Sequence, residues 1–149
     1  MKNKILFLFT FSFFIFSCNY FEETNDKASF YSSISNSEKI IIRSKKINQN
    51  EVVRNDSCFE KVTKYKAENL KEIENFEKLF ENSEYTGYCC CPDTNFAIYV
   101  YDESESFEKY FADTIKYDDK VQIFEKSFQF SFIIDKQKWK SYLKEIENK

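Results

Sequence analysis

Three consecutive cysteines, Cys89, Cys90 and Cys91, are the residues whose type and spacing come closest to a chemical site. With Cys58 upstream they supply thiolate ligands without imidazole, a set that selects copper(I), or zinc when all four thiolates bind. Neighbouring side chains of an extended segment point to opposite faces, so three in a row do not converge easily on one ion. A thiolate metal site is therefore only an alternative interpretation. A thiol exchange site is a further alternative, although redox sites usually show a CxxC motif, which this cluster lacks.

The sequence contains no histidine. The most common general base and the most common transition-metal ligand are thus missing, which excludes Ser-His-Asp and Cys-His catalysis, HExxH zinc sites and Cys/His zinc fingers. No nucleophile motif and no phosphate-binding loop can be found either. We expect a protein that is not an enzyme and carries no cofactor.

Carboxylates and tyrosines are the remaining candidates. The acids concentrate at expected hairpin tips, where solvated turns are the ordinary interpretation, and no DxDxDG calcium loop is present; they are Asp102, Glu103, Glu105, Glu108, Asp113, Asp118 and Asp119. Asp113 differs because it alternates in register with Phe107, Phe111 and Ile115, which favours an inward side chain, although an edge strand would make it unremarkable in function. Five tyrosines fit either a binding surface or the half-buried second face of a sheet; they are Tyr85, Tyr88, Tyr99, Tyr101 and Tyr110.

The N-terminus has the layout of a secretory signal. Lys2 and Lys4 precede an apolar run from Ile5 to Phe16, which ends at a small residue and a cysteine. The run is well short of the roughly 20 apolar residues that span a bilayer, so a transmembrane anchor is the weaker interpretation.

The tetrapeptide Ile15-Phe16-Ser17-Cys18 resembles the lipobox of bacterial lipoproteins. The resemblance implies that the Cys18 thiol receives a diacylglycerol, that residues 1–17 are removed, and that the new N-terminus is acylated, for example with palmitate. Two or three acyl chains anchor a protein stably in a lipid bilayer. The expected location is the cell membrane or the outer membrane, facing the periplasm or the cell exterior.

Export also changes the expectation for the other cysteines. In an oxidising compartment, the thiols that remain once Cys18 is lipidated favour disulfides. One bridge from Cys58 to Cys89, Cys90 or Cys91 is easy, whereas a second bridge between the remaining two is awkward in geometry.

Charge and composition limit the partners. The formal net charge is -3, and removal of residues 1–17 takes away two lysines and no acid, which leaves a more acidic mature chain. Such a surface disfavours nucleic acid and anionic lipid headgroups. Aromatic residues make up 19% of the chain, which is ample for one compact core.

The first half of the mature chain predicts a tether, two strands and a helix. Residues 18–37 lack a sustained period and predict a flexible tether. Strands are expected at Lys39–Arg43 and Cys58–Ala67, separated by a loop. Asn69 with Glu72 forms a capping box for a helix that ends near Asn82; its expected apolar face comprises Leu70, Ile73, Phe76, Leu79 and Phe80.

The second half switches to period two. It predicts strands at Asn95–Tyr101, Phe107–Ile115, Val121–Phe124 and Phe128–Ile134, with an acidic turn at Asp102–Ser106. A last helix, capped by Asp135, is expected to bury Trp139, Tyr142, Leu143 and Ile146. The fold class predicted is α+β: an antiparallel β-sheet of about five or six strands with two packed helices, in a single domain over 38–149.

These features favour a membrane-anchored lipoprotein that serves as a non-enzymatic binding or interaction module of the cell envelope. Its partners would be the bilayer, through Cys18, and an envelope protein or small ligand, but no nucleic acid. The alternative is a thiol-based copper, zinc or redox protein that uses the Cys89–Cys91 cluster.

Overall fold

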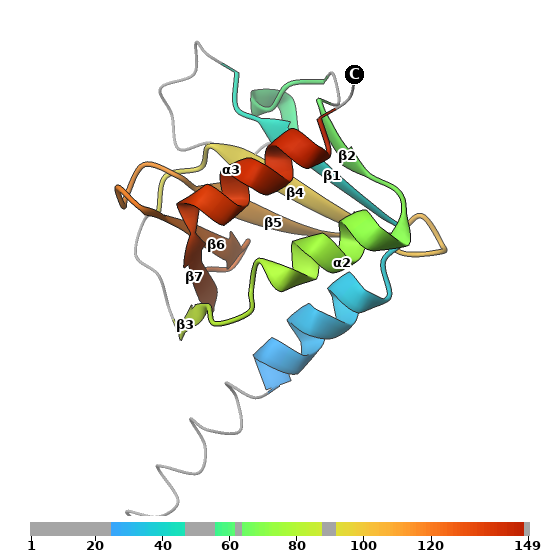
Figure 1. The fold of residues 1–149 in the computed structure, drawn as a ribbon, viewed down its shortest axis with the longest axis horizontal. Helices are drawn as coiled ribbons and strands as arrows, with labels where there is room; N and C mark the ends of the chain where they lie inside the picture. Colours follow the sequence, from blue (N-terminus) through green and yellow to red (C-terminus); the bar gives the residue numbers. More distant parts are fainter. Residues whose placement is uncertain (1–24, 47–55, 62–63, 88–91, 148–149) are drawn as a thin grey trace, which may run out of the picture. The chain divides into compact units, whose positions relative to one another are not determined.

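The structure is a computed structural model, and it describes residues 25–46, 56–61, 64–87 and 92–147 (Figure 1). The predicted signal peptide over 1–17, the lipidation site Cys18 and the cluster Cys89–Cys91 lie outside these residues and stay predictions. The chain divides into two compact units, 1–32 and 33–149. Among the described residues, none of the helices combines the length and the hydropathy that crossing a membrane requires.

One antiparallel sheet of seven strands organises the second unit, in the order β2-β1-β4-β5-β6-β7-β3. The α+β class is confirmed, with one strand more than the upper number expected. The bounds are β1 Lys39–Ser44, β2 Tyr65–Ala67, β3 Glu84–Thr86, β4 Phe96–Tyr101, β5 Phe107–Asp113, β6 Lys120–Glu125 and β7 Ser131–Asp135.

The strands β4 to β7 form a meander, close to the ranges that period two predicts. The largest difference is at β7, which begins at Ser131 and not at Phe128. Phe128 has a φ of 63°, and the Glu125 carboxylate accepts hydrogen bonds from the backbone N–H groups of Ser127 and Gln129, both at 2.8 Å. The Glu125 side chain thus closes a turn before β7 begins. Phe128 therefore lies in the loop, although it fits the apolar alternation of the strand.

The first half of the unit departs more from the prediction. Strand β1 is confirmed, but Cys58–Ala67 is not one strand: a 3-10 turn covers Asp56–Cys58, Phe59 forms an isolated bridge with Lys45, and only Tyr65–Ala67 pairs along β1. Strand β3 was not predicted, because three residues are too few to show a period.

Both predicted helices are present. Helix α2, Leu70–Lys78, has the capping box of Asn69 and Glu72, but Leu70 is 72% exposed and not part of the buried face. Helix α3, Lys136–Glu145, begins where the Asp135 carboxylate accepts a hydrogen bond from the backbone N–H of Lys138 at 2.8 Å. It buries the four predicted residues.

Residues 25–35 are helical, and the boundary between the two units falls within this helix. The sequence analysis predicts a flexible tether over 18–37, whereas residues 25–35 within it form a helix. Two residues of the helix that belong to the second unit are tied to it: Ile34 is fully buried, and the Ser33 hydroxyl lies 3.0 Å from the Tyr110 hydroxyl. The many serines of the stretch, which are weak helix formers, hid this helix from the sequence analysis.

The sheet has two unlike faces. Helices α2 and α3 both pack on one face, where Trp139 meets Phe96 and Phe80 meets Phe132 at ring distances of 5.7 and 5.5 Å (Figure 1). The opposite face, which we call the open face, carries no described α-helix of this unit, but the 3-10 turn Asp56–Cys58 packs on it. A second buried cluster lies there, made of Ile41, Cys58, Phe59, Ala97, Tyr99, Phe111 and Phe124.

Candidate functional site

Cations and aromatic rings share one end of the open face. We call this group the aromatic–basic patch and define it as Lys39, Arg43, Tyr99, Tyr101, Phe107 and Lys109. The strands β1, β4 and β5 lie side by side, and the register pairs Lys39 with Tyr101 and Phe107, and Ile41 with Tyr99 and Lys109. Because side chains alternate along a strand, all six project from the same side of the sheet.

The aromatic part of the patch is partly exposed. Phe107 is 49% exposed, and its ring centroid lies 5.5 Å from that of Tyr99 and 5.3 Å from that of Tyr101. Tyr99, by contrast, is buried, so it forms the floor on which the neighbouring side chains rest. An exposed phenylalanine held by two tyrosines is a preorganised apolar contact, typical of recognition surfaces.

The cations lie over these rings. The Lys39 ammonium is 4.6 Å from the Tyr101 centroid, the Arg43 guanidinium is 5.0 Å from Tyr99, and the Lys109 ammonium is 5.3 Å from Tyr99. Each such cation–π contact is worth about 0.5–2 kcal/mol, depending on its exposure to water. The ring contacts hold the positive charges close to the sheet.

The carboxylates next to the patch in sequence, among them Glu38, Asp102 and Glu108, form no salt bridge with Lys39 or Arg43 in the described part of the chain. Lys39 and Arg43 form no salt bridge with any residue that the structure describes, and the Nε atom of Arg43 is buried without a hydrogen-bond partner there. Lys66, on β2 beside Ile41, differs because its ammonium lies 2.6 Å from the Glu68 carboxylate. The positive charge of Lys39 and Arg43 is thus left to act on an incoming group.

The five candidate tyrosines are not one surface. Tyr99 and Tyr101 belong to the patch, whereas Tyr85 packs against Phe132 on the other face and Tyr110 is buried there, donating a hydrogen bond to the Glu108 carboxylate. Burial raises the pKa of Tyr110 above its ordinary range. Tyr88 lies outside the described residues.

Sequence reasoning missed the cations and Phe107 as a site. The sequence does contain a period-two pattern that could have indicated the patch. One strand carries it at Lys39, Ile41 and Arg43. Another strand carries it at Phe107, Lys109 and Phe111. Only the pairing of β1 with β4 and of β4 with β5 brings these two stripes together.

Asp113 points inward as expected and is 2% exposed, but β5 is a central strand, so the edge position considered for it is wrong. Its carboxylate accepts hydrogen bonds from the backbone N–H groups of Asp93, Ile115 and Lys116 at 2.8, 2.9 and 3.0 Å. Both oxygens are therefore used to hold two loops. Asp113 is a structural residue.

Cys58 forms no disulfide with any described residue, and its side chain is 3% exposed in the buried cluster of the open face. Its candidate partners Cys89, Cys90 and Cys91 lie outside the described residues, so the disulfide and the thiolate metal site stay predictions. The described residues that flank that cluster are fixed on the same face: Thr86 bonds to Ser131, and the backbone N–H of Asp93 bonds to Asp113.

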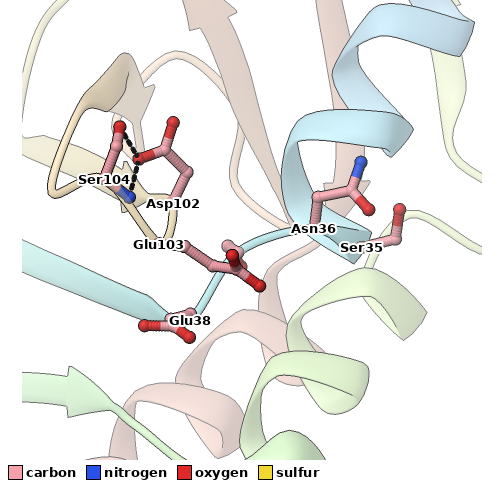
Figure 2. A pocket seen from close by; sticks show the side chains of 7 residues that line it. Ser35, Asn36, Glu38, Asp102, Glu103 and Ser104 are labelled. Carbon is pink, nitrogen blue, oxygen red and sulfur yellow. Dashed lines mark hydrogen bonds between the residues drawn. The ribbon is translucent and has the colours of Figure 1, made fainter.

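The predicted acidic turn lines an open hollow of about 590 Å³ (Figure 2). The hollow lies between the β4–β5 turn and the segment before β1, and is lined by Ser35, Asn36, Ser37, Glu38, Asp102, Glu103 and Ser104. One oxygen of Asp102 accepts hydrogen bonds from the backbone N–H and the hydroxyl of Ser104, at 2.9 and 2.7 Å, and these bonds lower the pKa of Asp102. This carboxylate is engaged in shaping the turn.

Metal-binding geometry is not found in the described part of the chain, where no group of three or more Cys, Asp or Glu side chains is placed to hold an ion. The carboxylates Glu105, Glu108, Asp118 and Asp119 are exposed side chains of turns and strand ends. None of the four lines the hollow of Figure 2, whose carboxylates are Glu38, Asp102 and Glu103. Comparison of the chain with protein-family models, with curated proteins and with solved structures finds no match.

Proposed function

We propose that this chain is a lipid-anchored, non-enzymatic binding module of the cell envelope, and that it holds its ligand on the aromatic–basic patch. The observation that carries the proposal is the combination of a half-exposed Phe107 with Lys39 and Arg43, whose charges have no described carboxylate partner. Aromatic residues and arginine are enriched at recognition surfaces and supply most of their binding energy.

The anchor is a separate part of the proposal. Cys18 is the acylated first residue of the mature protein, and the signal over 1–17 is removed. Mass spectrometry of the membrane fraction should find a lipid-modified peptide that begins at Cys18. An unmodified N-terminus at Met1 would contradict the anchor without bearing on the patch.

Site-specific photo-crosslinking tests the patch. A photoreactive phenylalanine analogue replaces Phe107 in the full chain, and a matched variant carries it at Leu70, which is also exposed but lies on α2. We expect a crosslinked adduct in cells from position 107 and none from position 70. Equal crosslinking from both positions, or none from 107, would contradict a binding role for the patch.

The competing function is a thiol-based copper, zinc or redox protein, and the observation on its side is that Cys58 has no disulfide partner among the described residues. Cys90→Ser distinguishes the two functions. A binding module keeps its crosslinked adduct at position 107 in this background, whereas a thiol protein loses bound metal or exchange activity. A titration of the unmodified chain with copper(I) or zinc provides the direct measurement.

A further inference from the structure

We infer that the ligand of the aromatic–basic patch is an acidic segment of another protein, bound in an extended conformation with apolar side chains between its acids. This inference rests on the proposed function, because it names the partner of the same surface. It follows from three properties of the patch, which are its charge, the spacing of its cations and its exposed ring.

The charge of the patch is opposite to that of the chain. The whole sequence has a formal net charge of -3, yet Lys39, Arg43 and Lys109 gather on adjacent strands of one face. Arg43 in particular holds a planar guanidinium over Tyr99, with its Nε buried and without a partner among the described residues. A carboxylate can accept two parallel hydrogen bonds from the two terminal Nη groups of a guanidinium, which makes a carboxylate the best-matched anion.

The spacing of the cations fits a second extended chain. Lys39 and Arg43 are four residues apart on β1, which places their Cα atoms about 13 Å apart at the ordinary rise of a strand. Side chains at positions i and i+4 of an extended peptide have the same separation and the same direction. A peptide along β1 can therefore present one acid to Lys39 and the next to Arg43. Lys109, two strands away from β1, lies roughly 10 Å to the side.

The exposed ring distinguishes a protein segment from a uniform polyanion. Phe107 and Tyr101 require apolar groups on the ligand, and binding gains most when such rings are covered. The acidic turn that follows Tyr101 carries Asp102, Glu103 and Glu105 and repels a polymer that is charged at every unit. A peptide with its acids confined to the positions of the cations satisfies both conditions.

A synthetic peptide provides the first test. The probe is the repeat Glu-Ser-Phe-Ser-Glu-Ser-Phe-Ser-Glu, in which the acids and the intervening phenylalanines all lie on one side of an extended strand. Its control has the same composition with the acids adjacent to one another. Binding to the full chain is measured by fluorescence anisotropy at low and at physiological salt. We expect the repeat to bind at least tenfold more tightly than the control, with an affinity that falls as salt rises.

Variants then assign the binding to the patch. Arg43→Ala should weaken binding of the repeat at least tenfold, and Phe107→Ala should weaken it severalfold, whereas the matched surface controls Lys140→Ala and Leu70→Ala should leave it unchanged. Arg43→Lys should restore only part of the affinity, since lysine cannot form the bidentate pair. Circular dichroism identifies any variant that fails to fold, and the comparison of the two peptides needs no variant.

Other ligand classes are outcomes of the same experiment. Alginate, single-stranded DNA and vesicles with anionic phospholipid are offered to the unmodified chain beside the peptide. Tighter binding of any of them than of the repeat, or equal binding of the repeat and its control, would overturn the acidic segment. An adduct at position 107 that maps to a segment without acids, or to a second copy of this chain, would overturn the inference and leave the binding role standing. The absence of that adduct would overturn both.

Discussion

Replacement of Asp113 by alanine should lower the free energy of unfolding by about 3 kcal/mol. The carboxylate is 2% exposed and accepts three backbone hydrogen bonds at 2.8 to 3.0 Å. Hydrogen bonds to a charged group contribute about 1.5–3 kcal/mol each. The sum overstates the loss, because Ile115 and Lys116 are in an exposed turn where water can replace the acceptor, whereas Asp93 is half-buried. The full loss of the bond from Asp93 and the reduced losses of the bonds from Ile115 and Lys116 together give about 3 kcal/mol.

An asparagine at position 113 distinguishes the contributions of the two carboxylate oxygens to stability. An amide that keeps its carbonyl toward the turn retains the bonds from Ile115 and Lys116, which both go to Oδ1, but offers no acceptor to the N–H of Asp93. We therefore expect Asp113→Asn to cost about 1–2 kcal/mol, between the alanine variant and the unmodified chain. Asp118→Ala, a substitution of an exposed acid in the next turn, should change stability by less than about 0.5 kcal/mol.

Urea unfolding followed by the fluorescence of Trp139 provides the assay. This is the only tryptophan of the chain, and it is 1% exposed in the core, so its emission reports global unfolding. The slope of free energy against urea should be the same for all four proteins. An alanine variant that loses less than about 1 kcal/mol, or that matches Asp118→Ala, would refute the assignment of Asp113 as the residue that holds the two loops.

Three further predictions concern other parts of the chain. Asn69→Ala removes the capping box of α2 and should cost about 1 kcal/mol in the same assay, with Lys71→Ala as the neutral exposed control. Burial raises the pKa of Tyr142, so stability is fully present below the unfolded pKa of about 10 and falls as pH rises further. Tyr142→Phe deletes a buried hydroxyl that has no partner among the described residues. The variant should lose less stability than the unmodified chain at alkaline pH, and its free energy of unfolding at neutral pH should be unchanged or higher. Thiol labelling in denaturant without reductant should leave Cys58 unlabelled if it is bridged to Cys89, Cys90 or Cys91, whereas labelling of Cys58 would reject the bridge.

Periodicity recovered the elements that are long enough to show a period. The meander and both capped helices follow from side-chain alternation and from the caps at Asn69 and Asp135. The elements that the sequence did not predict are short, or they form for reasons that local sequence does not show. Strand β3 exists because β7 offers an unpaired edge, and the helix over 25–35 was hidden by a polar composition.

The patch could not be predicted from local sequence, because it is assembled across strands. Nothing near Lys39 indicates that Tyr101 will lie beside it, and the isolated motif KIIIR predicts only a strand. Two of the five candidate tyrosines were correct for the patch, and the cations above them were overlooked since charged residues on strands are usually solvated.

The order of the strands has a consequence for how the chain folds. Strands β4 to β7 are joined by short turns and can pair soon after each is formed, whereas β1 is the first strand of the sheet along the sequence and pairs with β4 far downstream. Closing that long loop carries an entropic cost, so we expect the meander to fold first and β1 to dock on its edge late. Pulse-labelled hydrogen exchange should then protect the amides of β5 and β6 before those of β1, and simultaneous protection would contradict this order. The aromatic–basic patch would accordingly be completed only in the last step, when Lys39 and Arg43 arrive on rings that are already in place.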